Sequence, residues 1–292
     1  MFTFLQLTLS GLATGAIYAL VGLGFSLLWQ ASGTINFAQG EFVMLPAFCM
    51  LFCIENLHLP LWLAFLITCG LAMLTLGLVF NRVIVAPLRR YGVIPLVIAT
   101  LGLSTGLQST VKAVFGAEPQ PFPSIFPSTL IHIGELTLSW ADVGTLVLAG
   151  VIVFGMQLLL EKTLTGRAMQ AVAQNTEGAE ILGINVKRMV LLTFLANAVL
   201  ACVAALLVTP TYLATFDMGS TLSLKAFYAA IIGGFNETRG ALIGGLLIGV
   251  TENLVASYIS PGYKDGVALL LFMVVIMFRP QGLLGKIEER KV

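Results

Sequence analysis

The stretch LWLAFLITCGLAMLTLGLVF, residues 61–80, contains no charged side chain in 20 consecutive residues. At about 1.5 Å per residue, a helix of this length crosses the roughly 30 Å hydrocarbon core of a bilayer. Residues 5–29 and 189–213 form similar runs. The chain as a whole is 58% hydrophobic and 10% charged, which is too little charge to cover a soluble protein of 292 residues. The sequence therefore predicts an all-α, polytopic transmembrane helical bundle.

The basic residues predict how the chain is threaded through the membrane. Eleven of the 15 Lys and Arg residues fall in three clusters, at 82–90, 162–188 and 279–291. The positive-inside rule places all three clusters in the cytoplasm. Counting the membrane crossings needed to connect these clusters gives eight to nine membrane segments. The N-terminus is then outside and the basic tail 279–292 is inside. The first apolar run is too long for a signal-peptide core, so we expect a retained span and a single transmembrane domain over 1–292.

Two polar segments interrupt the apolar pattern and predict broken or re-entrant elbows. The first covers residues 30–41 and precedes a short apolar leg at 42–54. The second covers residues 233–240 and follows a leg of about ten residues at 226–235, near half the bilayer thickness. Irregular backbone at membrane depth is tolerated only where it packs inside protein or lines a wet cavity.

Polar side chains in the elbows and the following span are candidates for a translocation path. Ionisable groups at membrane depth usually face a bundle interior or a pathway. For the first elbow an ordinary cytoplasmic loop is the alternative, and for the pair in the last span a structural hydrogen-bonded role is the alternative. The candidate residues are Asn36, Gln39, Glu41, Asn236, Glu252 and Asn253.

Four glycines between the second elbow and that pair form two interleaved small-xxx-small patterns. Such patterns let a neighbouring helix approach backbone to backbone, so we expect a helix-packing surface. The glycines are Gly240, Gly244, Gly245 and Gly249.

The sequence offers no pattern for catalysis or for binding a cofactor. Cys49 and Cys53 share a helix face but have no His or Asp neighbour, so no metal site is expected. The segment GLLGK at 282–286 has the wrong spacing for a phosphate-binding loop and lacks the Ser or Thr that would hold the metal. With two histidines and no carboxylate cluster, an enzyme is not expected. The net charge of +1 gives no field that would recruit nucleic acid.

The cytoplasmic stretch GRAMQAVAQNTEGAEILGIN, residues 166–185, contains small apolar residues where a loop would normally be polar. Thr176 is predicted to cap a short helix that Gly183 ends, with Glu177 at its positive N-terminal end. A small apolar helix outside the membrane suits a socket on a soluble partner. An amphipathic helix lying in the membrane interface is the alternative.

Four blocks of sequence resemble a known family. The loop around Glu177, Ala179 and Gly183 is similar to the Glu-Ala-Ala…Gly loop of permease subunits in bacterial ABC importers. The segments GRAMQAVA (166–173), TINFAQGE (34–41), GGFNETRGALIGG (233–245) and FRPQGLLG (278–285) resemble the branched-chain amino-acid (Liv-type) permeases. Gly178 stands where the general loop has its second Ala, which should loosen the helix by less than about 1 kcal/mol. No Ile-x-Leu-Pro follows Gly183, which argues against a maltose-type permease.

The resemblance implies a permease subunit of the bacterial inner membrane that carries branched-chain amino acids. Its implied partners are membrane lipid, a second related permease, a periplasmic binding protein, and two cytoplasmic ATPases that would hold the ATP and Mg. Loop 161–188 would couple to the ATPases through Gly166, Arg167, Ala168, Glu177, Ala179 and Gly183.

A self-sufficient secondary transporter or channel for small polar organic solutes is the alternative, because two polar elbows would suit it equally. A stand-alone transporter has no use for the helix outside the membrane. The substrate stays open, because relatives of this family also carry urea, amides and other small organic solutes.

Overall fold

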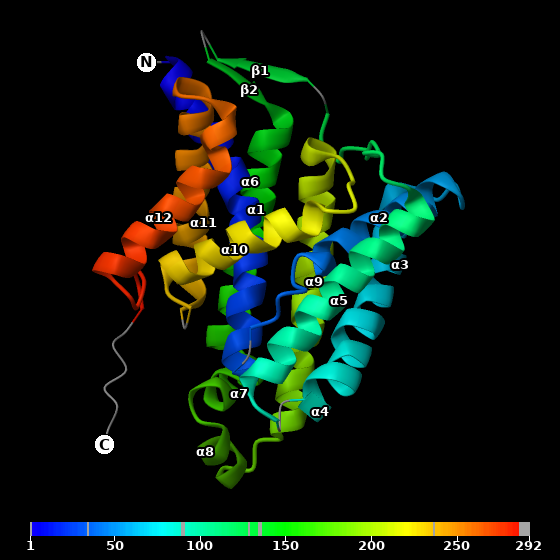
Figure 1. Cartoon of the computed structure of the whole chain (residues 1–292), viewed down its shortest axis with the longest axis vertical. Coiled ribbons are helices and arrows are strands. Elements are labelled where there is room, and N and C mark those ends of the chain that lie inside the picture. The colour runs from blue at the N-terminus through cyan, green and yellow to red at the C-terminus, as the bar shows by residue number, and fades with distance from the viewer. Residues whose placement is uncertain are drawn as a thin grey trace. The chain divides into compact units, whose positions relative to one another are not determined.

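The computed structural model describes residues 2–33, 35–88, 91–127, 129–133, 136–235 and 237–285 (Figure 1). Arg89, Arg90, Ser128, Asn236 and the tail from 286 onward therefore lie outside the described residues. The elements, in chain order, are α1 (Phe2–Ser32), α2 (Glu41–Glu55), α3 (Leu61–Ala72), η1 (Met73–Val79), η2 (Asn81–Val85), α4 (Ala86–Leu88), α5 (Val93–Phe115), β1 (Leu130–Ile133), β2 (Leu136–Ser139), α6 (Trp140–Lys162), α7 (Leu164–Gln174), α8 (Thr176–Ile181), α9 (Val186–Tyr212), α10 (Met218–Gly233), α11 (Thr238–Tyr258), η4 (Pro261–Tyr263) and α12 (Lys264–Phe278).

The predicted fold class, an all-α polytopic bundle, is confirmed. Within the described ranges, seven helices are long and apolar enough to cross a membrane. Two shorter helices, α2 with 15 residues and α10 with 16, occupy the two short legs beside the elbows. The length of α10 differs from the prediction, because the helix starts at Met218 and not at residue 226. Its polar first turns, which contain Ser220 and Thr221, resemble a loop in the sequence.

The predicted span at 61–80 is part of one continuous helix that runs from α3 through to α4. Its second half is π-helical over η1 and η2, a wider winding that the apolar pattern does not reveal. Gly77 in η1 lies against α9, and a Cβ there would be 2.7 Å from Cδ2 of Leu195. The glycine thus lets α9 pack closely against this helix.

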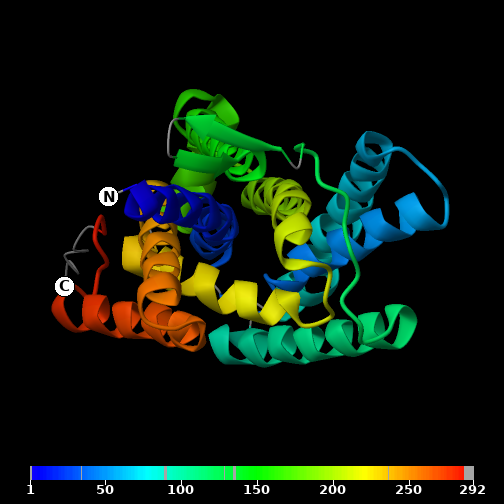
Figure 2. The same ribbon diagram turned by 90° about the horizontal axis from the view of Figure 1, so that it is seen from above.

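A small hairpin is the main departure from an all-helical chain. It lies in the proline-rich segment between α5 and α6. Strands β1 and β2 pair antiparallel, with Leu130 opposite Ser139 and Ile133 opposite Leu136. Figure 2 shows β2 continuing directly into α6.

The chain contains two compact units, each made of segments that are distant in sequence. Unit 1 comprises Met1–Ser26, Ile125–Gln157 and Lys225–Val292, and unit 2 comprises Leu27–Ser124 and Leu158–Leu224.

Unit 1 is held together by close contacts between glycines. On α11, Gly245 and Gly249 face α1, and a Cβ at Gly245 would lie 2.6 Å from the backbone oxygen of Gly15. Gly244 faces Ala229 on α10, and Gly240 faces Gly233 at the turn that joins α10 to α11. The four glycines therefore serve two different neighbours, α1 on one face and α10 on the other.

Unit 2 is built around aromatic packing between α2, the long 61–88 helix and α9. Phe42 packs edge-on against Phe80, with ring centroids 4.9 Å apart, and Phe80 lies 5.9 Å from Phe194. All three side chains are buried. This core holds the first elbow in place, because α2 begins where the elbow ends.

Candidate functional site

Unit 1 contains a buried ion pair in which Glu252 of α11 meets Lys225 of α10. The Nζ of Lys225 lies 2.9 Å from Oε1 of Glu252. Glu252 is fully buried and Lys225 is 7% exposed. A carboxylate and an ammonium at this depth are tolerated only as partners, so the pair links the two helices.

Three further groups complete this cluster. The hydroxyl of Tyr18 on α1 donates to Oε2 of Glu252 at 2.9 Å, and Lys225 also lies 2.8 Å from the carboxylate of Asp265. The Nζ of Lys264 is 4.0 Å from Oε2 of Glu252. Two cations thus face two carboxylates, and the cluster joins α1, α10, α11 and α12. The side chain of Asp265 is 77% exposed, so the cluster runs from the buried interior to the surface.

Asn253, the neighbour of Glu252 in the sequence, has a separate role. Its side-chain amide donates to the backbone oxygen of Leu7 on α1 at 3.1 Å. The two adjacent polar residues therefore bind different atoms and do not form one hydrogen-bonded pair.

The first elbow is packed inside unit 2. Asn36 and Gln39 are both almost fully buried. The Asn36 side chain accepts a hydrogen bond from the backbone N–H of Ala38, which fixes the turn. Gln39 and Asn197 on α9 exchange two hydrogen bonds between their amides, at 2.8 and 3.0 Å. The elbow is therefore tied to α9 by side-chain hydrogen bonds.

Glu41 is the second buried carboxylate and the first residue of α2. Its Oε1 accepts hydrogen bonds from Ser104 at 2.8 Å and from Gln108 at 2.7 Å, both on α5. Its Oε2 has no hydrogen-bond partner in the described part of the chain. Gly219, at the start of α10, lies so close that an added Cβ would overlap this oxygen. The helix N-terminus gives the carboxylate some stabilisation, although no cation contacts it among the described residues.

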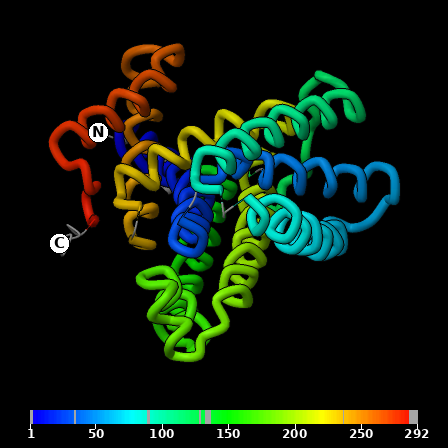
Figure 3. The backbone as a smooth tube through the Cα atoms, turned by 60° about the horizontal axis from the view of Figure 1, so that its bottom comes forward, coloured from blue at the N-terminus to red at the C-terminus, as the bar shows by residue number. Residues whose placement is uncertain are grey.

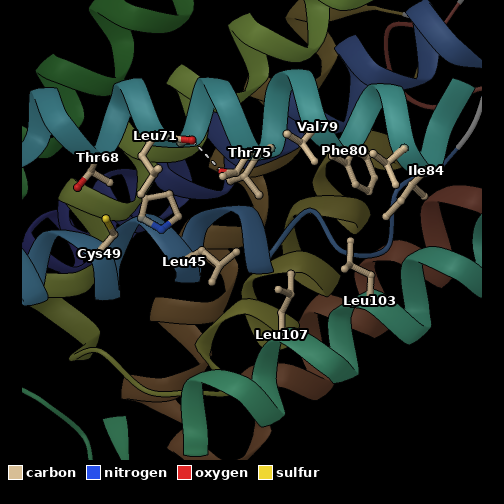
Figure 4. Close-up of a pocket in the computed structure, with 14 residues that line it drawn as sticks. Leu45, Cys49, Thr68, Leu71, Thr75, Val79, Phe80, Ile84, Leu103 and Leu107 are labelled. Atoms are coloured by element: carbon tan, nitrogen blue, oxygen red, sulfur yellow. Dashed lines mark hydrogen bonds between the residues drawn. The ribbon is translucent and has the colours of Figure 1, made fainter. Parts of the chain in front are cut away.

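Unit 2 also contains an apolar groove of about 410 Å³ between α2, the 61–88 helix and α5 (Figure 4). Leu45 and Cys49 line it from α2, and Leu103 and Leu107 from α5. Two threonines line its wall: the Thr75 hydroxyl donates to the backbone oxygen of Leu71 at 2.8 Å, while the buried Thr68 hydroxyl has no hydrogen-bond partner among the described residues. The groove is thus apolar apart from these two hydroxyls.

Helices α7 and α8 form a hairpin of short helices beside one end of α9 (Figure 3). Thr163 caps α7 by accepting from the backbone N–H of Gly166, and Asn175 caps α8 by accepting from that of Gly178. The prediction that Thr176 caps α8 is therefore wrong by one residue, because the Thr176 hydroxyl donates back to the backbone of α7. Gly183 ends the hairpin with φ +80°, a conformation that favours glycine.

The coupling-loop residues separate into an inner and an outer set. Gly166 and Ala179 are buried, as is Val172. Arg167, Glu177 and Gly183 are exposed, while Ala168 is half-buried. Next to Gly183, Ile181 is 86% exposed and Leu182 is 79% exposed. The outward surface of the hairpin thus includes two large apolar side chains beside charged ones, and Ala179 packs inward.

The sequence reasoning missed the partners of the buried groups. Lys225 was missed because the predicted leg began one residue after it, yet a lone Lys in an apolar helix signals a buried acidic partner. Ser104 and Gln108 were also missed, although their spacing places both on one face of α5. In the ranges that the structure covers, there is no group of three His, Cys, Asp or Glu residues that could hold a metal ion.

Membrane-length helices enclosing buried polar pairs, with a helical hairpin beyond the spans, define a multi-pass membrane protein of the transport class. The chain belongs to the family described as the permease component of branched-chain amino acid transport systems, which matches residues 7–276.

Three relatives agree with this assignment. The chain is 32% identical to the high-affinity branched-chain amino acid transport system permease protein of Pseudomonas aeruginosa, over 99% of this chain and 98% of the relative. It is 31% identical to the corresponding Escherichia coli (strain K12) protein, again over 99% and 98%. It is 26% identical to a probable branched-chain amino acid transport permease of Methanocaldococcus jannaschii, over 92% and 89%. No solved structure matches the chain with significance.

Proposed function

We propose that this chain carries branched-chain amino acids across the bacterial inner membrane as the permease subunit of an ATP-driven importer. A periplasmic binding protein would deliver the substrate, a second related permease would complete the channel, and two cytoplasmic ATPases would drive it. The names of the relatives support the substrate, and the absence of a phosphate-binding loop in the sequence supports the separate motor.

The observation that carries the coupling part of the proposal is the exposed apolar end of the α7–α8 hairpin. Ile181 and Leu182 lie outside the membrane-length helices and still expose most of their surface. Apolar side chains of this size gain free energy when a partner covers them, at about 25 cal/mol per Å². A socket on an ATPase subunit would cover them, and a push on the hairpin would reach α9, against which α7 and α8 both pack.

The two buried carboxylates differ in what they offer a substrate. Glu252 is already neutralised by Lys225, whereas Oε2 of Glu41 has no partner among the described residues. We therefore favour Glu41, with Gln39 beside it, as the group that meets the ammonium of the passing amino acid. Gly219 covers this oxygen, so α10 would move aside to expose it.

The coupling proposal is tested by uptake of radiolabelled leucine in cells that express the chain with its partner subunits. Glu177→Lys or Gly183→Trp should abolish uptake while membrane abundance stays normal, because charge or bulk would block docking. Ile181→Glu with Leu182→Glu should do the same. Gln174→Glu, which changes charge at an exposed polar position on the same hairpin, is the matched control. Normal uptake and ATPase co-purification in the three docking variants would exclude the hairpin from coupling.

A further inference from the structure

A second cavity in unit 2, of about 440 Å³, lies between the 61–88 helix and the first turns of α9. Three cationic residues line it, Arg82 from η2 and Lys187 and Arg188 from α9, together with the amide of Asn81. No acidic residue is among its lining residues. The cavity is therefore a basic pocket between two membrane-spanning helices.

The three cations are available to a ligand. All three residues are exposed, and no hydrogen bond or ion pair engages their side chains within the ranges that the structure describes. Like charges held at one cavity repel one another unless an anion lies between them. The arrangement thus favours an anionic ligand.

The pocket lies at the depth where the hydrocarbon core ends. The uncharged run of the long helix stops at Asn81, directly before Arg82. The uncharged run of α9 begins at residue 189, directly after Lys187 and Arg188. The cations of both helices therefore lie at the level of the lipid head groups.

The base of the pocket is apolar. Leu78 lines it from the long helix, while Val85 and Val190 line it and are themselves buried. A ligand that fills this cavity needs an anionic group for the rim and hydrocarbon for the base. A phospholipid has both, and it is present at this depth by default.

We propose that this pocket binds the head group of an anionic phospholipid. Arg82, Lys187 and Arg188 hold the lipid phosphate, and the first methylenes of its chains cover Leu78, Val85 and Val190. An acidic segment of an ATPase subunit would satisfy the cations but would leave the apolar base uncovered. None of its lining residues belongs to the α7–α8 hairpin or to the candidate translocation path.

The test uses the full-length chain, purified in nanodiscs that contain phosphatidylglycerol and phosphatidylcholine in equal amounts. Native mass spectrometry counts the lipid molecules that stay bound to the protein after it is released from the nanodisc. We expect the wild type to retain phosphatidylglycerol selectively. Arg82→Gln with Arg188→Gln should weaken retention about fivefold for each cation removed, or about 25-fold in all. Retention should also fall as salt is raised.

Two control variants keep the test decisive. Lys162→Gln with Arg279→Gln removes two basic residues elsewhere and should leave retention unchanged. Arg82→Lys with Arg188→Lys keeps the charges and should retain the lipid, which shows that loss in the Gln variant is not a folding defect.

Equal retention in the Gln variant and the wild type, or an equal loss in the Lys162 and Arg279 control, would overturn the proposal. Displacement of the lipid by inorganic phosphate would indicate a free-phosphate site. Loss of ATPase co-purification with retained lipid would assign the pocket to the ATPase.

Discussion

At the scale of single residues, Lys225 and Glu252 depend on each other. Both are buried in helices of a membrane protein, and each neutralises the other at 2.9 Å. Removing one partner of such a pair usually costs about 3–5 kcal/mol, because the remaining charge has no compensation. Removing both charges with side chains of similar volume is often close to neutral. The difference between the single and the double variants therefore distinguishes a structural role of Glu252 from a role in transport.

We predict that Glu252→Gln and Lys225→Met each reduce membrane abundance and thermal stability, and that the double variant recovers much of both. The reason is that the double variant leaves no charge at the two buried positions, while Asp265, which loses Lys225 as its partner, is 77% exposed to solvent. Thermal unfolding of the purified protein and quantitative immunoblots of membranes are the measurements. If Glu252 instead meets the substrate ammonium, uptake would fall at normal abundance in Glu252→Gln, and Lys225→Met would not restore it.

For Glu41 we predict a loss of uptake without a loss of membrane abundance. Glu41→Gln keeps the shape of the side chain, and its amide oxygen can still accept from Ser104 and Gln108. Membrane abundance should therefore stay near the wild-type level, while loss of the charge lowers uptake about 5- to 150-fold, or 1–3 kcal/mol. Leucine uptake normalised to abundance is the measurement. Uptake within about twofold of the wild type would remove Glu41 from the path.

At the scale of elements, α11 owes its position to the missing side chains at Gly245 and Gly249. We predict that Gly245→Ala sharply lowers the amount of folded protein, because the new methyl group would overlap the backbone of Gly15 and Ala19. Gly150→Ala on α6 is the matched control, since nothing lies within 4 Å of the added Cβ, and it should be neutral or slightly stabilising. Fluorescence-detected size-exclusion chromatography of both variants measures the folded fraction. Equal yields would show that α11 can shift away from α1 without penalty.

The helices themselves were largely predictable, and the exceptions have physical causes. Helix α5, for example, begins directly after Gly92 and ends directly before Gly116, and both glycines have a positive φ. The start of α10 was missed, because Gly219, Ser220 and Thr221 are poor helix formers that tertiary packing holds in a helix. The cap of α8 was displaced by one residue, because Asn175 and Thr176 are both good cap residues and the sequence does not rank them.

At the scale of the whole molecule, the basic clusters predict the orientation in the membrane, and this prediction can be measured directly. We predict that a cysteine at position 124, in the segment before the hairpin, reacts with an impermeant maleimide in intact cells. A cysteine at position 175, in the cap of α8, should react only after the cells are opened. Both are built in a background in which Cys49, Cys53, Cys69 and Cys202 are replaced. Labelling of position 175 in intact cells would invert the topology and remove the hairpin from the cytoplasm.

The helices could be predicted from the sequence, but the hydrogen-bond partners of the buried carboxylates could not. Glu41 and Gln108 are 67 residues apart in the sequence, and Tyr18 and Glu252 are 234 apart. A single sequence shows that a buried carboxylate needs a partner, but it does not show which helix supplies that partner. The candidate residues could therefore be named, whereas their contacts depend on how the helices pack.

The pair formed by Lys225 and Glu252 also constrains how the protein is made. The ribosome produces α10 first, and this helix of 16 residues reaches only about 24 Å and has a lysine near its middle. A lysine at the centre of a helix costs about 2.5–3.5 kcal/mol during insertion into the bilayer. An isolated α10 is therefore disfavoured in the bilayer, and pairing Lys225 with Glu252 of α11 removes this cost. The pair thus favours entry of α10 and α11 into the lipid as one helical hairpin with its charges matched.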